Sequence, residues 1–188
     1  MKKLFKITIV ALFAVIMVSC GGASEDNFVG KWTPDFTSVE FHLHDDLVES
    51  MGDEINEKEI KASLKEAQPM ASMINIEFKE DGVLTVGAMG ENQDLNWSVE
   101  GSDLVLSGTV PEGEFKGKEV KLAFEILDSN ADEFTIKISA QSIKEQLNEQ
   151  YKSEMDKAIS EAGDMKNLLD EKVLSDTWAS ITFKKKES

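Results

Sequence analysis

Two histidines, His42 and His44, form the sharpest candidate for a chemical site in this sequence. Glu40 precedes them, and Asp45 and Asp46 follow directly. A spacing of two residues places both imidazoles on one face of a β-strand, beside the carboxylate of Glu40. Two imidazoles and a carboxylate can hold Zn²⁺ or Cu²⁺, so His42 and His44 are candidate metal ligands.

The same alternation is also compatible with a strand that binds no metal. Val39, Phe41 and Leu43 lie on the opposite face and would point into a core, which leaves both histidines in water. A third ligand at diagnostic spacing does not accompany the pair. We therefore favour this second interpretation and expect no cofactor.

A second polar cluster, Asp128, Asn130 and Asp132, has the spacing that begins a calcium-binding loop. Glu133 stands where such a loop requires Gly, and Ser139 stands where it requires a bidentate Glu. The segment is therefore predicted to be the polar tip of a hairpin.

The sequence contains no recognised catalytic motif. It has no Gly-x-Ser-x-Gly elbow, no His-Glu-x-x-His and no Gly-rich phosphate loop. Both histidines fall in one predicted strand, so nucleophilic triads of the usual kinds lack members. Carboxylate pairs carry no information among 36 Asp and Glu residues. We predict a protein that is not an enzyme.

Charge and cysteine content exclude further classes. The 188 residues include 20 Lys, no Arg and 36 acidic residues, for a net charge of -16. This acidity, without the bidentate Arg fork, argues against any nucleic-acid partner. The single Cys excludes a disulfide framework and a multi-cysteine metal site.

Residues 1–19 have the form of a secretory signal. Lys2, Lys3 and Lys6 precede an apolar run over 7–18, which is shorter than the roughly 20 residues that span a bilayer. The run ends in Met17-Val18-Ser19-Cys20, which resembles the lipobox of bacterial lipoproteins. The resemblance implies cleavage before Cys20 and its acylation, for example by palmitate. The alternatives are a secreted protein cut near Ser19 and an uncleaved anchor.

Residues 20–27 would then be a lipidated acidic linker. Ser24-Glu25-Asp26 resembles the acidic export tag of surface lipoproteins of the Bacteroidota, and a plain acidic linker is the alternative. Each buried methylene adds about 0.8 kcal/mol, so several acyl chains on Cys20 make stable membrane attachment plausible. The expected location is the outer membrane or the cell surface.

Residues 28–184 are predicted to form one domain, because their length supports a single core and no linker interrupts them. Alternating apolar and polar residues predict about nine short strands, typical of an all-β barrel or sandwich. The strand candidates, which lie between turn signals, are 28–33, 39–44, 74–78, 83–88, 95–99, 104–107, 120–126, 134–138 and 179–183. Asp81-Gly82 predicts a hairpin, and Gly101-Ser102-Asp103 predicts another.

Two segments have helical periodicity instead. Asn56 and Glu59 form a capping pair before an apolar stripe that ends at Pro69. Ser142 and Glu145 form a capping box before a stripe over 143–162, about 30 Å long, and a shorter helix continues to residue 173. We expect the long helix to pack on the sheet. A partner chain or a membrane surface is the alternative.

Gly30-Lys31-Trp32 resembles the Gly-x-Trp signature that opens lipocalin and lipocalin-like barrels. Trp97 and the two hairpin turns follow in an order similar to that of lipocalin-like lipoproteins of the Bacteroidota, over most of residues 27–184. The resemblance implies a mainly β fold with helical additions. It would be an antiparallel up-and-down β-barrel with one helix after strand 2 and a long helix before the last strand.

In this family an Arg near the end of the barrel stacks on the first-strand Trp. This chain has no Arg, and Lys184, Lys185 and Lys186 stand nearby. Trp32 is expected to plug the closed end of the barrel, and core packing is also expected for Trp97 and Trp178.

We therefore predict a lipid-anchored, extracytoplasmic, non-catalytic binding module for a small apolar ligand. The ligand would enter a core enclosed by alternating apolar residues: Phe41, Ile76, Leu84, Val86, Leu122, Phe124 and Ile136. One alternative is a protein–protein interaction lipoprotein with a filled barrel and a contact face over 143–173. The other is a metal-binding protein that uses His42 and His44.

Overall fold

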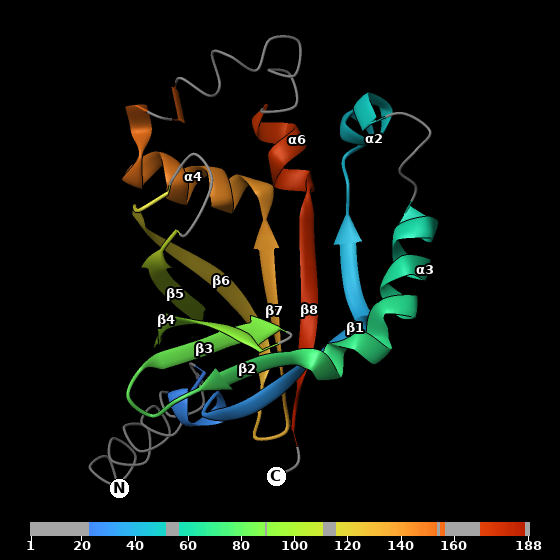
Figure 1. The fold of residues 1–188 in the computed structure, drawn as a ribbon. Helices are drawn as coiled ribbons and strands as arrows, with labels where there is room; N and C mark the ends of the chain where they lie inside the picture. Colours follow the sequence, from blue (N-terminus) through green and yellow to red (C-terminus); the bar gives the residue numbers. More distant parts are fainter. Residues whose placement is uncertain are drawn as a thin grey trace, which may run out of the picture.

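The computed structural model describes residues 23–51, 57–88, 90–110, 116–153, 155–156 and 170–186. The predicted signal and Cys20 lie outside these residues. Within them, eight antiparallel strands form a closed barrel in sequential order, with the last strand paired to the first (Figure 1). The predicted mainly β, up-and-down barrel is confirmed.

The strands are β1 (Gly30–His42), β2 (Ile74–Phe78), β3 (Val83–Ala88), β4 (Glu91–Glu100), β5 (Asp103–Thr109), β6 (Glu119–Ser129), β7 (Glu133–Ser139) and β8 (Trp178–Lys185). The helices are η1 (Glu25–Asn27), α2 (Asp45–Met51), α3 (Glu57–Ala67), η3 (Gln68–Met73), α4 (Ala140–Gln150) and α6 (Glu171–Asp176). Here η marks a 3₁₀ helix.

The predicted turns join strands as expected. Gly82 and Gly101 adopt positive φ angles of 78° and 68°, which favour glycine. Between β6 and β7, the side-chain oxygen of Asn130 accepts hydrogen bonds from the backbone nitrogens of Asp132 and Glu133, at 2.9 and 3.0 Å. The polar cluster that includes Asp128 therefore forms a hairpin tip, as predicted.

The prediction of nine strands is wrong, because the first two candidates are one continuous strand. In β1, Asp35 pairs with Thr182 and Glu40 pairs with Ser180, so residues 36–39 bulge opposite a single residue of β8. The bulge breaks the period-two pattern at the position where a turn was expected. The helical insertion therefore follows the first strand, not the second.

Side chains satisfy the backbone of this bulge. The backbone nitrogen of Thr37 donates to Asp35 Oδ1 at 3.0 Å, and the nitrogen of Thr182 donates to Ser38 Oγ at 2.9 Å. The polar residues that suggested a turn are thus the groups that hold the strand together across its irregularity.

The helices agree with the predictions only in part. Within the described residues α3 spans Glu57–Ala67 and Pro69 lies in η3 directly beyond it, whereas the predicted capping residue Asn56 lies outside them. The long helix is shorter than predicted, because α4 ends at Gln150 and residues 157–169 lie outside the described part. Its N-cap is Ser139, whose Oγ accepts from the backbone nitrogen of Ser142 at 3.0 Å, so Ser142 is not the cap. Helix α2 was not predicted.

The two ends of the barrel differ in how completely the strands pair. At the end that holds Gly30 and Lys185, which we call the filled end, neighbouring strands are hydrogen-bonded. At the end that holds His42 and Trp178, the open end, three pairs separate. Within the described residues, β1 pairs with β2 only up to Trp32, β4 pairs with β5 only from residue 96 on, and β6 pairs with β7 only from residue 125 on.

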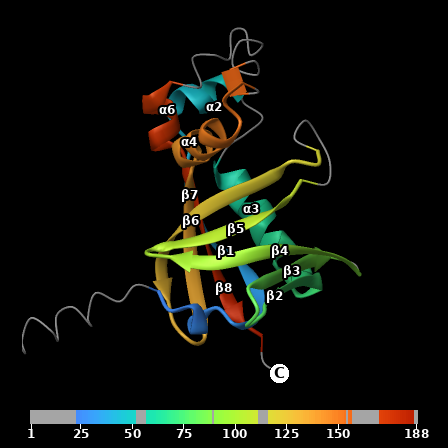
Figure 2. The same cartoon turned by 90° about the vertical axis from the view of Figure 1, so that its left-hand side faces the viewer.

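Helices cover two of these three gaps. α3 and η3 lie along β1, where the backbone nitrogen of Phe36 donates to Gln68 Oε1 at 2.6 Å (Figure 1). α4 lies beside the unpaired part of β6 and packs on α6 through the buried residues Val173 and Leu174. Figure 2 shows α2, α4 and α6 grouped at the open end.

Two glutamines of α4 replace a neighbouring strand. Gln146 donates to the carbonyl oxygen of Ala123 at 3.1 Å and accepts from its nitrogen at 2.6 Å. Gln150 makes the same pair of bonds with Lys121, at 2.6 and 2.8 Å. The spacing fits because four helical residues rise about 6 Å and two strand residues about 6.8 Å. The hydroxyl of Tyr151 continues the row by donating to the carbonyl oxygen of Glu119.

The double variant Gln146→Leu, Gln150→Leu tests this helix-to-strand pairing. We expect amide hydrogen exchange at Lys121 and Ala123 to accelerate, because both nitrogens lose their acceptors. Urea unfolding should show a loss of about 1 kcal/mol per glutamine. Gln141→Leu is the matched control, since Gln141 bonds only to Glu145 of the same helix. Unchanged exchange at both positions would contradict the pairing.

Candidate functional site

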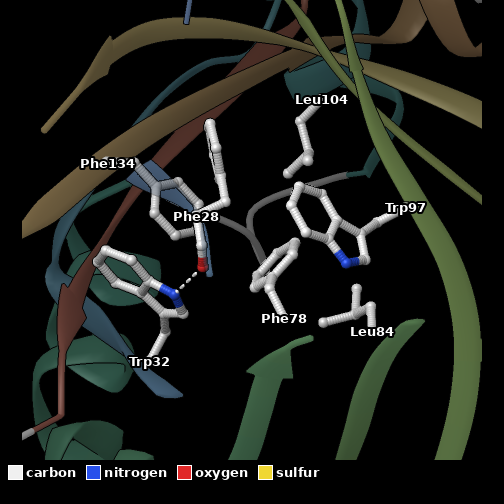
Figure 3. Close-up of a cluster of buried hydrophobic side chains, with 7 residues drawn as sticks. All are labelled: Phe28, Trp32, Phe78, Leu84, Trp97, Leu104 and Phe134. Carbon is white, nitrogen blue, oxygen red and sulfur yellow. Dashed lines mark hydrogen bonds between the residues drawn. The ribbon is translucent and has the colours of Figure 1, made fainter. Parts of the chain in front are cut away.

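A cluster of aromatic and aliphatic side chains fills the end of the barrel at Gly30. Figure 3 shows the cluster, in which Phe28, directly after η1, and residues from β1, β2, β3, β4, β5 and β7 point toward one another. Its buried members are Phe28, Trp32, Phe78, Leu84, Trp97, Leu104 and Phe134. Trp32 is fully buried, and its ring centre lies 4.7 Å from that of Phe134 in an edge-to-face arrangement.

Trp32 makes specific polar contacts as well. Its Nε1 donates to the carbonyl oxygen of Phe28 at 2.6 Å (Figure 3). The Nζ of Lys185 lies 5.2 Å from the Trp32 ring centre and donates to the carbonyl oxygen of Val29 at 3.0 Å. In this chain, which has no Arg, a lysine thus supplies the cation over the first-strand tryptophan.

Gly30 is favoured at this point by its backbone conformation. Its φ angle is +128°, a value that L side chains rarely adopt. A Cβ there would also lie 2.9 Å from Cε of Lys185. Gly30, Trp32 and Trp97, which the sequence singled out, therefore lie together at the filled end.

Trp178 differs from the other two tryptophans. It pairs with His42 and Ser139 on the outer face of the barrel, and Lys137 Nζ lies 4.9 Å from its ring centre. It is half-buried, so the expectation that it packs in the core is wrong. Trp178 occupies an outward-facing position of its strand. Because it lies at the end of the strand, the alternating sequence pattern did not show which way its side chain points.

An ion pair joins the bulged strand to the last strand. Lys184 Nζ lies 2.7 Å from Asp35 Oδ2, and the Asp35 side chain is only 13% exposed. The hydrogen bond from Lys184, followed by that from Thr37, lowers the pKa of Asp35 below its ordinary value. The same bond raises the pKa of Lys184.

The structure separates the roles of the two histidines. His42 ends β1 and is exposed, whereas His44 directly precedes α2, with its carbonyl oxygen accepting from the nitrogens of Leu47 and Val48. Nδ1 of His44 accepts from the backbone nitrogen of Asp46 at 3.2 Å, which leaves Nε2 for any metal. Among the residues described, no group of three or more His, Cys, Asp or Glu side chains is arranged to hold a metal. The metal site stays a prediction.

An apolar hollow of about 260 Å³ lies at the open end, between β4, β5 and β6. It is lined by Gln93, Leu95, Leu106, Ser107, Gly108, Thr109, Val110, Val120, Leu122 and Phe124. Of the residues predicted to enclose a ligand, Leu122 and Phe124 line it. Leu84 belongs instead to the filled end. Ile76, Val86 and Ile136 pack against that cluster, as Phe124 also does.

The burial of inward-facing side chains falls along β4 and β5 toward this hollow. In β5, Leu104 is 1% exposed, whereas Leu106, the next residue on the same face, is half-buried. Leu122 of β6, which pairs with Leu106, is also half-buried. Their exposed area faces the hollow, so an apolar molecule placed there would gain about 25 cal/mol for each Å² that it covers.

Gly108 and Gln93 mark the gap between β4 and β5. A Cβ at Gly108 would lie 2.5 Å from Cδ2 of Leu95, so a larger residue here would clash with that side chain unless it moved. The Gln93 side chain crosses the gap and donates to the carbonyl oxygen of Thr109 at 3.3 Å. Neither residue was selected from the sequence. A glycine inside a strand is the one signal that pointed to this place.

Three large apolar side chains are exposed elsewhere on the described surface. Met70 and Met73 of η3 are 51% and 58% exposed, and Leu127 of β6 is 50% exposed. Single exposed residues of this kind are ordinary on a protein surface. They do not form a binding site by themselves.

No family model, curated protein or solved structure matches this chain. In the described part of the chain, none of the helices is both long and apolar enough to cross a membrane.

Replacement of Trp32 by Ala tests the packing of the filled end. We expect a loss of about 3–5 kcal/mol in the free energy of unfolding, because a fully buried indole leaves a large cavity. Urea denaturation measures the loss. Trp178→Ala, on the outer face, should lose less than half as much. Equal losses in the two variants would contradict the assignment of Trp32 to the core.

The Asp35–Lys184 pair predicts an acid-dependent contribution to stability. Because folding lowers the pKa of Asp35, its carboxylate stabilises the fold above the unfolded pKa and ceases to do so as the pH falls through the folded pKa. Asp35→Asn should therefore be less stable than the natural protein at neutral pH. The difference should vanish in acid. Unfolding midpoints measured from pH 7 to pH 2 check this, and a difference that is constant with pH would rule it out.

Proposed function

We propose that the protein is a lipid-anchored, extracytoplasmic, lipocalin-like module that binds a small apolar ligand without converting it. The observation that carries the proposal is the apolar hollow at the open end, next to inward-facing side chains that remain half-buried. Its volume of about 260 Å³ is just under the roughly 300–1,000 Å³ typical of ligand pockets. The ligand is therefore small, or only its chain or ring enters.

The filled end supports the likeness to lipocalins. The Gly-x-Trp signature at Gly30 and Trp32 meets a cation from the last strand, Lys185, over the indole. An eight-stranded antiparallel barrel with helices before its last strand accompanies it. These features support a lipocalin-like architecture. The proposed ligand class is inferred from the apolar lining of the hollow.

The proposed tether leaves from the opposite end. Ala23 packs on the filled-end cluster and stands three residues after Cys20 in the sequence. Acylation at Cys20 would therefore hold the filled end toward the membrane. The hollow would then face the aqueous space of the periplasm or the cell exterior.

Binding of the neutral dye Nile red to residues 20–188 carrying Cys20→Ser tests the proposal, since this chain has no acyl group of its own. We expect enhanced fluorescence on binding to the hollow. Leu122→Trp should weaken binding about tenfold or more, equivalent to about 1.4 kcal/mol, because the indole fills the hollow. Lys121→Trp is the control, because Lys121 is exposed and belongs to the neighbouring, outward position.

Dye binding that Leu122→Trp leaves unchanged would exclude the hollow as the site. Native mass spectrometry of the protein purified from its own membrane is the complementary measurement. A bound neutral small molecule would support the proposal, whereas a bound metal ion or a stoichiometric protein subunit would favour the alternatives named above.

A further inference from the structure

Among the described residues that line the hollow, Gln93 carries the amide group, while Ser107 and Thr109 alternate in β5 with the inward-facing Leu106 and Gly108. Gln93, Leu95 and Trp97 alternate along β4, and Trp97 belongs to the filled-end cluster, so Gln93 shares the inward face. It lies where β4 no longer pairs with β5 within the described residues. Gln93 therefore stands at the mouth of the hollow.

The amide of Gln93 has capacity beyond its one internal bond. A glutamine side chain carries two N–H donors and a carbonyl acceptor. One N–H is used on the carbonyl oxygen of Thr109, at 3.3 Å. The second N–H and the carbonyl oxygen can meet a polar group of a ligand whose apolar part lies against Leu95 and Leu106.

The lining offers no counter-ion for a charged ligand. Among the described residues that form it, none is Asp, Glu, Lys or His. A charged group moved into such a site loses its hydration without gaining a partner. The net charge of -16 also disfavours anions at long range.

Three charged side chains near the hollow, Lys121, Lys118 and Asp94, have partners outside it. Lys121 points outward and forms an ion pair with Glu100 at 2.9 Å. Lys118, above Val120 at the rim, lies 4.8 Å from the ring centre of Tyr151. On β4, Asp94 faces outward and accepts from Thr85 Oγ1 at 2.6 Å.

We infer that the hollow selects an uncharged apolar molecule with a hydrogen-bonding head, such as an alcohol or amide, and that Gln93 recognises this head. The inference rests on the proposed function and adds a ligand class to it. A fatty acid anion or an alkylammonium of the same chain length is rejected for want of a counter-ion. A hydrocarbon of the same chain length, which has no polar head, binds less well because it leaves the Gln93 amide without a hydrogen-bond partner.

A matched series of ten-carbon probes tests the inference: 1-decanol, decanoate, decylammonium and decane, each competing with Nile red at pH 7.5 for residues 20–188 carrying Cys20→Ser. We expect decanol to displace the dye about tenfold more effectively than either charged probe, and better than decane. In Gln93→Met, which keeps the length of the side chain but not its amide, the advantage of decanol over decane should disappear. In Gln93→Lys, the preference should shift toward decanoate.

Asn96→Met is the control, because it makes the same amide-to-thioether change on the exposed, outward face of β4 and should leave the order of probes unchanged. Circular dichroism and urea unfolding verify that each variant is folded. Equal binding of decanoate and decanol overturns the inference but leaves the proposed function intact. A decanol preference that survives in Gln93→Met overturns the role of Gln93. Failure of dye and probes alike to bind overturns the proposed function itself.

Discussion

The burial of one indole, that of Trp32, is the constraint on which the barrel depends. A buried indole N–H needs an acceptor, and the carbonyl oxygen of Phe28 supplies it at 2.6 Å. The chain before β1 must therefore cross the end of the barrel, and the positive φ of Gly30 turns it into the strand. Lys185 then covers the ring from β8. Residues from both ends of the domain thus contact the Trp32 side chain, which closes the filled end of the barrel.

Tight closure at one end leaves the other end to be completed by different means. Where strands separate, their backbone groups need new partners, and Gln68 provides one for β1 while Gln146 and Gln150 provide them for β6. Between β4 and β5 the described residues supply only the side chain of Gln93. The hollow therefore lies at the gap that no described helix covers. The candidate site arises because the hydrogen bonds between β4 and β5 are incomplete, and not from a separate motif.

Much of this architecture could be predicted from the sequence, because half-buried strands and tight turns leave local signals. β6 and β7 alternate cleanly, and the Gly82 and Gly101 turns stand where expected. The bulge in β1 could not be predicted, since its polar residues and Pro34 imitate a turn. Residues 91–94 are all polar and carry no period-two signal. The pairing of β4 with β3 as far as Glu91 extends the alternation of Leu95 and Trp97 to Gln93, so the polar residues themselves gave no signature for the residue most relevant to ligand choice.

The polarity of the barrel bears on where a ligand would come from. In the proposed arrangement the acylated Cys20 lies beyond the filled end, and the hollow lies toward the far end, between β4, β5 and β6. A molecule that reaches the hollow must then cross water, which a hydrocarbon does poorly and a compound with a polar head does better. Without the proposed signal the chain would carry 17 Lys against 36 acidic residues, and this surface would also keep it apart from anionic lipid. The proposed orientation places the hollow away from the bilayer, and the uncharged amide of Gln93 stands at its opening. Both features are therefore consistent with one kind of ligand, an apolar molecule that is soluble enough to arrive from solution.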